Sequence, residues 1–138
     1  MMAAGLDPVA RREFMQLIVA QARQHRRTTL FSSHLIDEVE RCADRVGIIH
    51  QGRMRFEGAL DEFSGLVRRV RLPAGAEFAL PPGFEIWRDE EIDGVRSLAL
   101  RAEPSAWETF ALPPGAAFAE MSLEDRFIAC VGSTVVRI

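Results

Sequence analysis

The stretch of residues 28–50, TTLFSSHLIDEVERCADRVGIIH, decides the fold class. Residues 28–32 are β-branched or apolar and predict a short strand, and residues 46–50 predict a second one. Both lack the alternation of a half-buried strand, which is typical of parallel strands buried on both faces. Between them we expect a helix that Ser33 caps and whose buried stripe is Leu35, Ile36, Val39, Cys42 and Ala43. The stretch therefore predicts an α/β fold.

The residues on either side extend this pattern. Asp7 can cap backbone N–H groups and Pro8 suits a first helical position, so a helix is predicted to begin there and to end near His25. Residues 51–57 predict a tight turn and a returning hairpin strand, which Gly58 closes. The order of elements is then helix, strand, helix, strand and hairpin.

The first domain, residues 1–58, is expected to be incomplete. Buried parallel strands need neighbours on both sides, and this chain does not supply them, so residues 1–58 resemble the end of a larger sheet domain. The strands over 28–32 and 46–50 would then expose an open edge. We expect self-association through that exposed sheet edge, or local disorder before Gly58, and a better ordered second domain.

The second domain, residues 59–138, is predicted to be a small α+β accessory domain. Asp93-Gly94 is a type I′ turn signal between strands over residues 84–91 and 95–101. The remaining elements are a helical stretch at 60–63, a strand at 67–72, a helix with a capping box of Ser105 and Glu108, a strand at 116–120, a last helix started by Ser122 and Asp125, and a tail at 133–138 that can add an edge strand.

Composition excludes several functions. The 17 basic residues of this 138-residue chain are all arginine, so neither a phosphate-binding P-loop nor Schiff-base lysine chemistry is possible within it. A net charge of −3 argues against nucleic-acid binding. Cys42 and Cys130 have neither metal-site nor disulfide spacing and are expected to be free thiols, with no metal site. No apolar run is long enough to span a bilayer, so we expect a cytoplasmic location.

Several motifs in a fixed order resemble a known family. Gly5-Leu6-Asp7-Pro8 is followed by a helix, by the 28–34 segment that ends at His34, by residues 35–46, and by His-Gln-Gly-Arg-Met at 50–54. This arrangement is similar to the last third of an ABC transporter ATP-binding subunit, and the resemblance is continuous from Gly5 to about Glu62. It implies that the first domain is the C-terminal remnant of a P-loop ATPase parallel sheet.

The resemblance implies roles for individual residues. His34 would be the switch histidine, which contacts the γ-phosphate of ATP and orders the attacking water. Gly5, Leu6, Asp7 and Pro8 would be the D-loop, which acts across the interface of two ATP-binding subunits. ATP and Mg²⁺ are the implied cofactors. A membrane permease subunit and a second ATP-binding subunit are the implied partners, at the inner membrane. Taken singly, Asp7 is equally well explained as a helix cap and His34 as a residue at a strand–helix junction.

The family's Walker A, Q-loop, signature and Walker B segments are not in this sequence. In the family register Met1 stands at the position of the catalytic glutamate, so we expect the chain alone neither to bind ATP tightly nor to hydrolyse it. Whether it is part of an enzyme is left open. A non-catalytic regulatory or subunit-interaction module and a truncated gene product are the alternatives.

A C-terminal motif indicates the subtype. Ser122-Leu123-Glu124-Asp125-Arg126-Phe127 resembles the C-terminal extension of the ATP-binding subunits of ABC-2 type exporters. A capped amphipathic helix explains the same residues without any such role. The expected function is therefore that of a partial exporter ATP-binding subunit that supplies the D-loop and the switch histidine.

Overall fold

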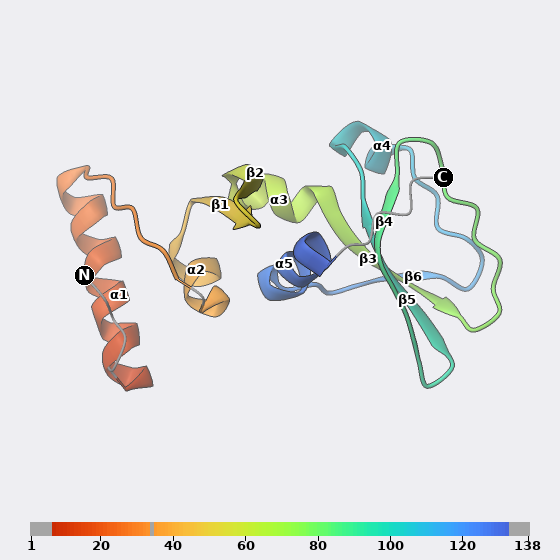
Figure 1. Ribbon diagram of the computed structural model, residues 1–138, viewed down its shortest axis with the longest axis horizontal. Helices are drawn as coiled ribbons and strands as arrows, with labels where there is room; N and C mark the ends of the chain where they lie inside the picture. Colours follow the sequence, from red (N-terminus) through yellow and green to blue (C-terminus); the bar gives the residue numbers. More distant parts are fainter. Residues whose placement is uncertain (1–6, 34, 133–138) are drawn as a thin grey trace. The chain divides into compact units, whose positions relative to one another are not determined.

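A computed structural model describes residues 7–33 and 35–132 of the chain (Figure 1). Gly5, Leu6 and His34 lie outside the described residues, as does the tail at 133–138. The chain divides into two compact units, Met1–Asp44 and Arg45–Ile138. The predicted boundary after residue 58 separates two domains of the family and does not describe compact units of this structure. It stays a prediction.

The first unit begins with α1, Pro8–His25. Asp7 has extended backbone angles, and its Oδ1 accepts a hydrogen bond of 2.8 Å from the N–H of Ala10. Pro8 occupies the first turn, where its missing N–H costs nothing. The helix ends at Arg26, which adopts the left-handed conformation with φ 51°. The predicted helix start and end are confirmed.

The second helix, α2, spans Ile36–Cys42. Its N-cap is Leu35, which has no side-chain capping bond, so the predicted cap at Ser33 is wrong. The Ser33 Oγ instead accepts a hydrogen bond of 2.9 Å from the N–H of Leu35, one residue before the helix. The residues of the predicted stripe are half-buried within this unit.

The strand predicted over residues 28–32 is not formed. Leu30 is 97% exposed, whereas the apolar residues of this segment predicted that its side chain would be buried. A strand is stabilised by hydrogen bonds to a neighbour, and none of the described residues pairs with this segment. Local β propensity alone was therefore not sufficient.

The second unit opens with a hairpin of β1, Arg45–His50, and β2, Arg53–Ala59. The two strands pair antiparallel, with Val46 opposite Gly58 and Ile49 opposite Met54. Val46 and Ile48 are buried while Ile49 is 66% exposed, so burial alternates along β1. The expectation of a parallel strand buried on both faces is wrong for the structure described, although the returning hairpin strand is confirmed.

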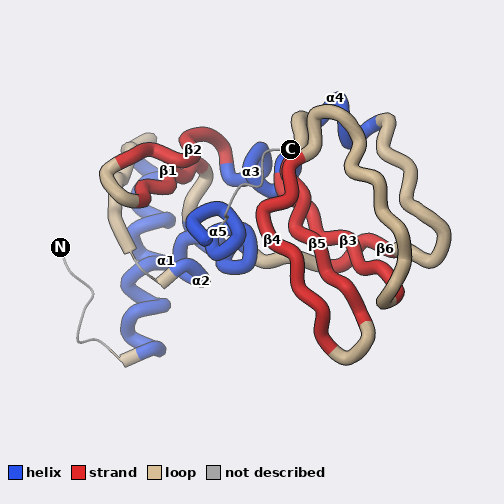
Figure 2. Tube along the Cα trace, turned by 45° about the vertical axis from the view of Figure 1, so that its right-hand side comes forward, coloured by secondary structure: helices blue, strands red, loops and turns tan. Residues whose placement is uncertain are grey.

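A four-stranded antiparallel sheet follows (Figure 2). The helix α3, Leu60–Leu66, leads into β3, Val67–Pro73. The other strands are β4, Glu85–Ile92, β5, Val95–Arg101, and β6, Ala117–Ala119, in the order β4-β5-β3-β6. Asp93 and Gly94 have φ of 52° and 76°, which confirms the predicted type I′ turn. The chain is thus a mixture of helices and sheet, as predicted, but every described strand pair is antiparallel.

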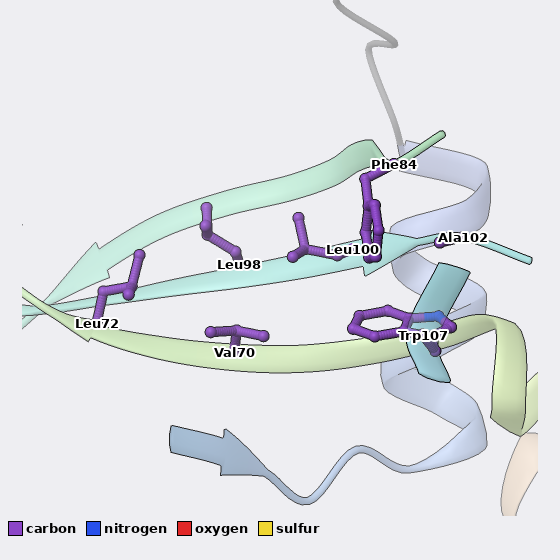
Figure 3. Packing of buried hydrophobic residues seen from close by; sticks show 7 residues of the cluster. All are labelled: Val70, Leu72, Phe84, Leu98, Leu100, Ala102 and Trp107. Atoms are coloured by element: carbon purple, nitrogen blue, oxygen red, sulfur yellow. The ribbon is translucent and has the colours of Figure 1, made fainter. Parts of the chain in front are cut away.

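One face of this sheet carries the main core (Figure 3). The buried residues are Val70, Leu72, Phe84, Leu98, Leu100, Ala102 and Trp107. Trp107 lies on α4, Pro104–Glu108, and its Nε1–H donates a 3.1 Å hydrogen bond to the carbonyl of Leu66. The predicted Ser105 cap is wrong, because Pro104 takes the first turn and Glu103 is the N-cap. Proline's fixed φ makes it a natural first residue, which moves the helix start back.

The other face of the sheet contacts α5, Leu123–Gly132. The Ser122 Oγ accepts from the N–H of Asp125, and Asp125 Oδ2 accepts from the N–H of Ser122, which confirms the predicted capping box. The guanidinium of Arg126 donates to the carbonyls of Val67, at 2.8 Å, and of Met121. Residues of the motif at 122–127 therefore cap α5 and bind it to the start of β3.

Candidate functional site

The candidate site consists of the starts of α1 and α2, because the family-like residues precede these two helices. Of the predicted D-loop, only Asp7 and Pro8 are described, and both serve the first turn of α1. Residue 34 falls outside the described residues. The structure therefore neither brings Asp7 together with the predicted switch histidine nor separates them.

An ion pair connects the two helices. Arg11, one turn into α1, places its Nε 3.3 Å from Glu38 Oε1, in the first turn of α2. The two side chains are 24% and 16% exposed, so water screens this pair less than a fully exposed one. Arg41 Nε donates to the carbonyl of Asp37 on α2 itself. Sequence reasoning missed the Arg11–Glu38 pair, since nothing in the spacing shows which faces of two separate helices meet.

A hollow of about 820 Å³ lies between the same two helices. Met15, Val19 and Leu35 are among its apolar lining residues, and Arg12 and Arg23 are among its basic ones. Bound phosphates are usually cradled by successive backbone N–H groups of a glycine-rich loop, whereas two helix sides line this hollow. The described lining of the hollow therefore differs from the loop cradle of a phosphate site.

The thiols are not activated. Cys42 is half-buried beside this hollow, and burial raises the pKa of its thiol, with Glu38 adding to the effect and Arg41 opposing it. Cys130 is buried on α5, and burial raises its pKa as well, against the opposing charge of Arg55. Both stay protonated at neutral pH, where a thiol is a poor nucleophile. The structure leaves both thiols outside a disulfide, as predicted, with Cys130 buried and Cys42 only half-buried.

Carboxylates in the second unit are held in ion pairs. Asp89 accepts two hydrogen bonds from Arg96, at 3.0 and 2.7 Å, and this lowers the pKa of the carboxyl against a smaller effect of burial. Glu90 lies 2.5 Å from Arg88. Within residues 7–33 and 35–132, no group of three or more His, Cys, Asp or Glu side chains is placed to hold a metal ion.

The described residues thus define a small helix-and-sheet protein in which an ion pair links the starts of α1 and α2. Comparison with known proteins supplies the class. The chain is 33% identical over 120 residues to an ABC transporter ATP-binding protein of Methanosarcina acetivorans, a match that covers 78% of this chain and 35% of that protein. This share exceeds what either compact unit contains, so the match includes residues of both.

Two further relatives agree. The bacitracin transport ATP-binding protein BcrA of Bacillus licheniformis is 40% identical over 57 residues, which are 41% of this chain and 19% of that protein. The energy-coupling factor transporter ATP-binding protein EcfA2 of Enterococcus faecalis is 32% identical over 81 residues, 55% of this chain and 28% of that protein. The chain is a relative of the ATP-binding proteins of ABC transporters, and the resemblance seen in its motifs is confirmed.

The chain spans about a third or less of the length of these relatives. No protein-family model matches the chain, and no solved structure matches it. Among the residues that the structure describes, none of the helices combines the length and the apolar character needed to cross a membrane.

Proposed function

We propose that this chain forms the part of an ABC-2 type exporter ATP-binding subunit that carries the D-loop, Gly5 to Pro8, and the switch histidine, His34. The observation that carries the proposal is the similarity to an ABC transporter ATP-binding protein over 78% of the chain. In the complete subunit, residues 28–32 and 46–50 are proposed to be strands of the P-loop ATPase sheet, in a domain that ends at residue 58, with residues 59–138 as the accessory domain.

In this proposal His34 donates a hydrogen bond to the γ-phosphate and orients the attacking water. An imidazole suits the task because it exchanges a proton near neutral pH and can both donate and accept. The chain contains no lysine, so its own residues offer no P-loop cradle for the phosphates. ATP and Mg²⁺ would be held by the Walker A and Walker B segments of the complete subunit, and this chain would complete the site.

Asp7 is proposed to act across the interface with a second ATP-binding subunit. Its Oδ1 already accepts a hydrogen bond from Ala10, so the carboxylate is fixed at the start of α1. The Arg11–Glu38 ion pair fastens α1 to the helix that follows residue 34. A displacement of Asp7 at the subunit interface would therefore be transmitted toward the segment that carries His34.

The exporter subtype rests on the second unit. The motif from Ser122 to Phe127 is used to cap α5 and to bind it to β3, which supports a folded accessory domain rather than a loose extension. We propose that a membrane permease is the partner, and that the assembled subunit lies at the cytoplasmic face of the inner membrane.

The test is made on an assembled ATP-binding subunit, with the Walker A and Walker B segments supplied in the same chain or by a second one. His34→Ala should lower ATP turnover by about 10²-fold, as expected for the loss of a group that positions the nucleophile. His25→Ala, at the exposed end of α1, is the matched control and should retain full turnover. Equal turnover in both variants would refute the role proposed for His34.

The permease partner is tested separately. The subunit should co-purify with a polytopic permease encoded beside it, and deletion of residues 59–138 should weaken that association. Retention of the complex after the deletion would exclude the accessory domain as its attachment.

A further inference from the structure

The two edges of the four-stranded sheet differ in charge. β4 forms one edge, and five of its eight residues are charged: Glu85, Arg88, Asp89, Glu90 and Glu91. β6 forms the other edge and consists of Ala117, Phe118 and Ala119. Charged side chains on an edge strand prevent it from pairing with another chain. The β4 edge has this protection, and the β6 edge does not.

The uncharged character extends well beyond β6 itself. Residues 109–119 form the longest run without a charged side chain in the sequence, eleven residues, in a chain of which 27% is charged. Ala117 is exposed and Phe118 is 48% exposed. The ring of Phe118 lies 6.1 Å from that of Trp107 and 6.0 Å from that of Phe110, so it is the exposed end of an aromatic cluster.

We propose that β6 is an interface between two copies of this chain. The β6 strands pair antiparallel about a two-fold axis at Phe118, so that the sheets of the two copies become one continuous sheet. Phe118 then faces Phe118 of the second copy, and Ala117 faces Ala119. This is an isologous contact, in which one surface serves both partners and closes the assembly at a dimer.

The charge distribution selects both the occupant and the register. A neutral strand pairs at the lowest cost with another neutral strand, because no charge is then buried without a partner. With the axis at Phe118, the charged Glu120 lies opposite Ala116 of the second copy. An axis at Glu120 would instead place two carboxylates directly opposite each other, which is unfavourable. The same segment of a second copy therefore fits this edge in one particular register.

The test is the oligomeric state of the full chain, measured by sedimentation equilibrium over a range of concentrations. We expect a reversible monomer–dimer equilibrium for the unchanged chain. Ala117→Lys places a charge on the edge, leaves the ring contacts of Phe118 in place, and should raise the dimer dissociation constant about tenfold or more. Circular dichroism melting will show whether the variant is folded.

Two matched controls use the same change from an apolar residue to lysine. Ile92→Lys lies on β4, at the opposite edge, and Ile49→Lys lies on the exposed face of β1; both positions are more than 60% exposed. Neither change should alter the dissociation constant. A chain that is monomeric at all concentrations, or a dimer that Ile49→Lys disrupts and Ala117→Lys does not, would overturn the proposal.

A second measurement needs no substitution. Amide hydrogen exchange of residues 116–120 should slow as the concentration of the unchanged chain is raised, while exchange in β4 stays constant. Exchange at 116–120 that is independent of concentration would also overturn the proposal. None of these experiments uses ATP, so their outcome is independent of the function proposed above.

Discussion

Arg11 Nε lies 3.3 Å from Glu38 Oε1, and this ion pair joins the first turns of α1 and α2. The D-loop residues precede the first of these helices and residue 34 precedes the second. This ion pair therefore links the two helices that follow the D-loop residues and residue 34.

Removal of this pair should loosen α2. Arg11→Ala is expected to destabilise the first unit by about 1 kcal/mol or less, which is the usual range for a pair that retains some contact with water. Amide exchange in α2 should become faster. Arg12→Ala, at the neighbouring exposed position, is the control. A double-mutant cycle with Glu38→Gln that shows no coupling between the two side chains would disprove the link.

Two substitutions of Asp7 separate its structural role from its proposed one. Asp7→Ala removes the cap that binds the N–H of Ala10 and should destabilise α1 by about 1 kcal/mol. Asp7→Asn keeps a capping oxygen and should leave the helix intact. If the carboxylate acts across the subunit interface, Asp7→Asn will still lower the ATP turnover of the assembled subunit. Unchanged turnover in a folded Asp7→Asn protein would show that Asp7 is only a cap.

Trp107 should be much more sensitive to substitution than Trp87. It is 5% exposed and donates to the carbonyl of Leu66, so Trp107→Ala is expected to cost about 3–5 kcal/mol of unfolding free energy. Trp107→Phe retains most of the packing but removes the donor to Leu66, whose carbonyl keeps its hydrogen bond from the N–H of Ala102, so a loss of about 1 kcal/mol is expected. Trp87→Phe, on the edge strand β4, should change stability by less than about 0.5 kcal/mol. Urea unfolding of the three variants measures their losses of unfolding free energy and shows whether they follow this order.

The Asp89–Arg96 pair should make stability depend on pH in the acid range. The hydrogen bond from Arg96 lowers the pKa of Asp89 below the ordinary value of an aspartic acid, and the unfolded chain lacks this bond. Its contribution is therefore fully present above the unfolded pKa and is lost as the pH falls through the folded one. The effect is small, because the Asp89 side chain is 42% exposed.

The measurement compares urea midpoints of the wild type and of Asp89→Asn. The difference between the two proteins should be constant from pH 7 to pH 5 and should shrink as the pH falls below the ordinary pKa of an aspartic acid. If the difference grows on acidification, the Asp89–Arg96 pair does not stabilise the ionised carboxylate, and the prediction is wrong.

The 138-residue chain alone should not hydrolyse ATP, because its sequence contains no lysine for a P-loop. Phosphate release by the purified chain is expected to equal that of His34→Ala. Turnover clearly above this background would contradict the prediction and would require a different nucleotide site.

Local chemistry allowed several features of both units to be predicted. The Asp93-Gly94 turn, the Ser122–Asp125 capping box and the Asp7 cap each depend on residues within a few positions of one another. The segment at 28–32 failed because a strand depends on a partner that propensity does not reveal. Ser105 was predicted to be the N-cap, but Pro104, one residue earlier, occupies the first turn of α4 and the helix begins there.

The candidate site was predictable only as a set of motifs. Spacing and order led to the family, and the comparisons confirmed it. The Arg11–Glu38 pair could not be predicted, because it depends on how two helices face each other across an irregular segment. The roles of Asp7 and His34 stay predictions.

The junction between α3 and β3 has a consequence for the order in which the chain is made. The carbonyl of Leu66 accepts from the N–H of Ala102 and from Trp107, and the next carbonyl, that of Val67, accepts from Arg126. These donors lie up to 59 residues later in the sequence. During synthesis this junction must therefore wait, with two adjacent carbonyls still bound to water, until nearly the whole second unit has left the ribosome. A ribosome stalled shortly before residue 126 would hold a chain whose sheet lacks its last fastening, and such a chain should be readily cleaved by proteases.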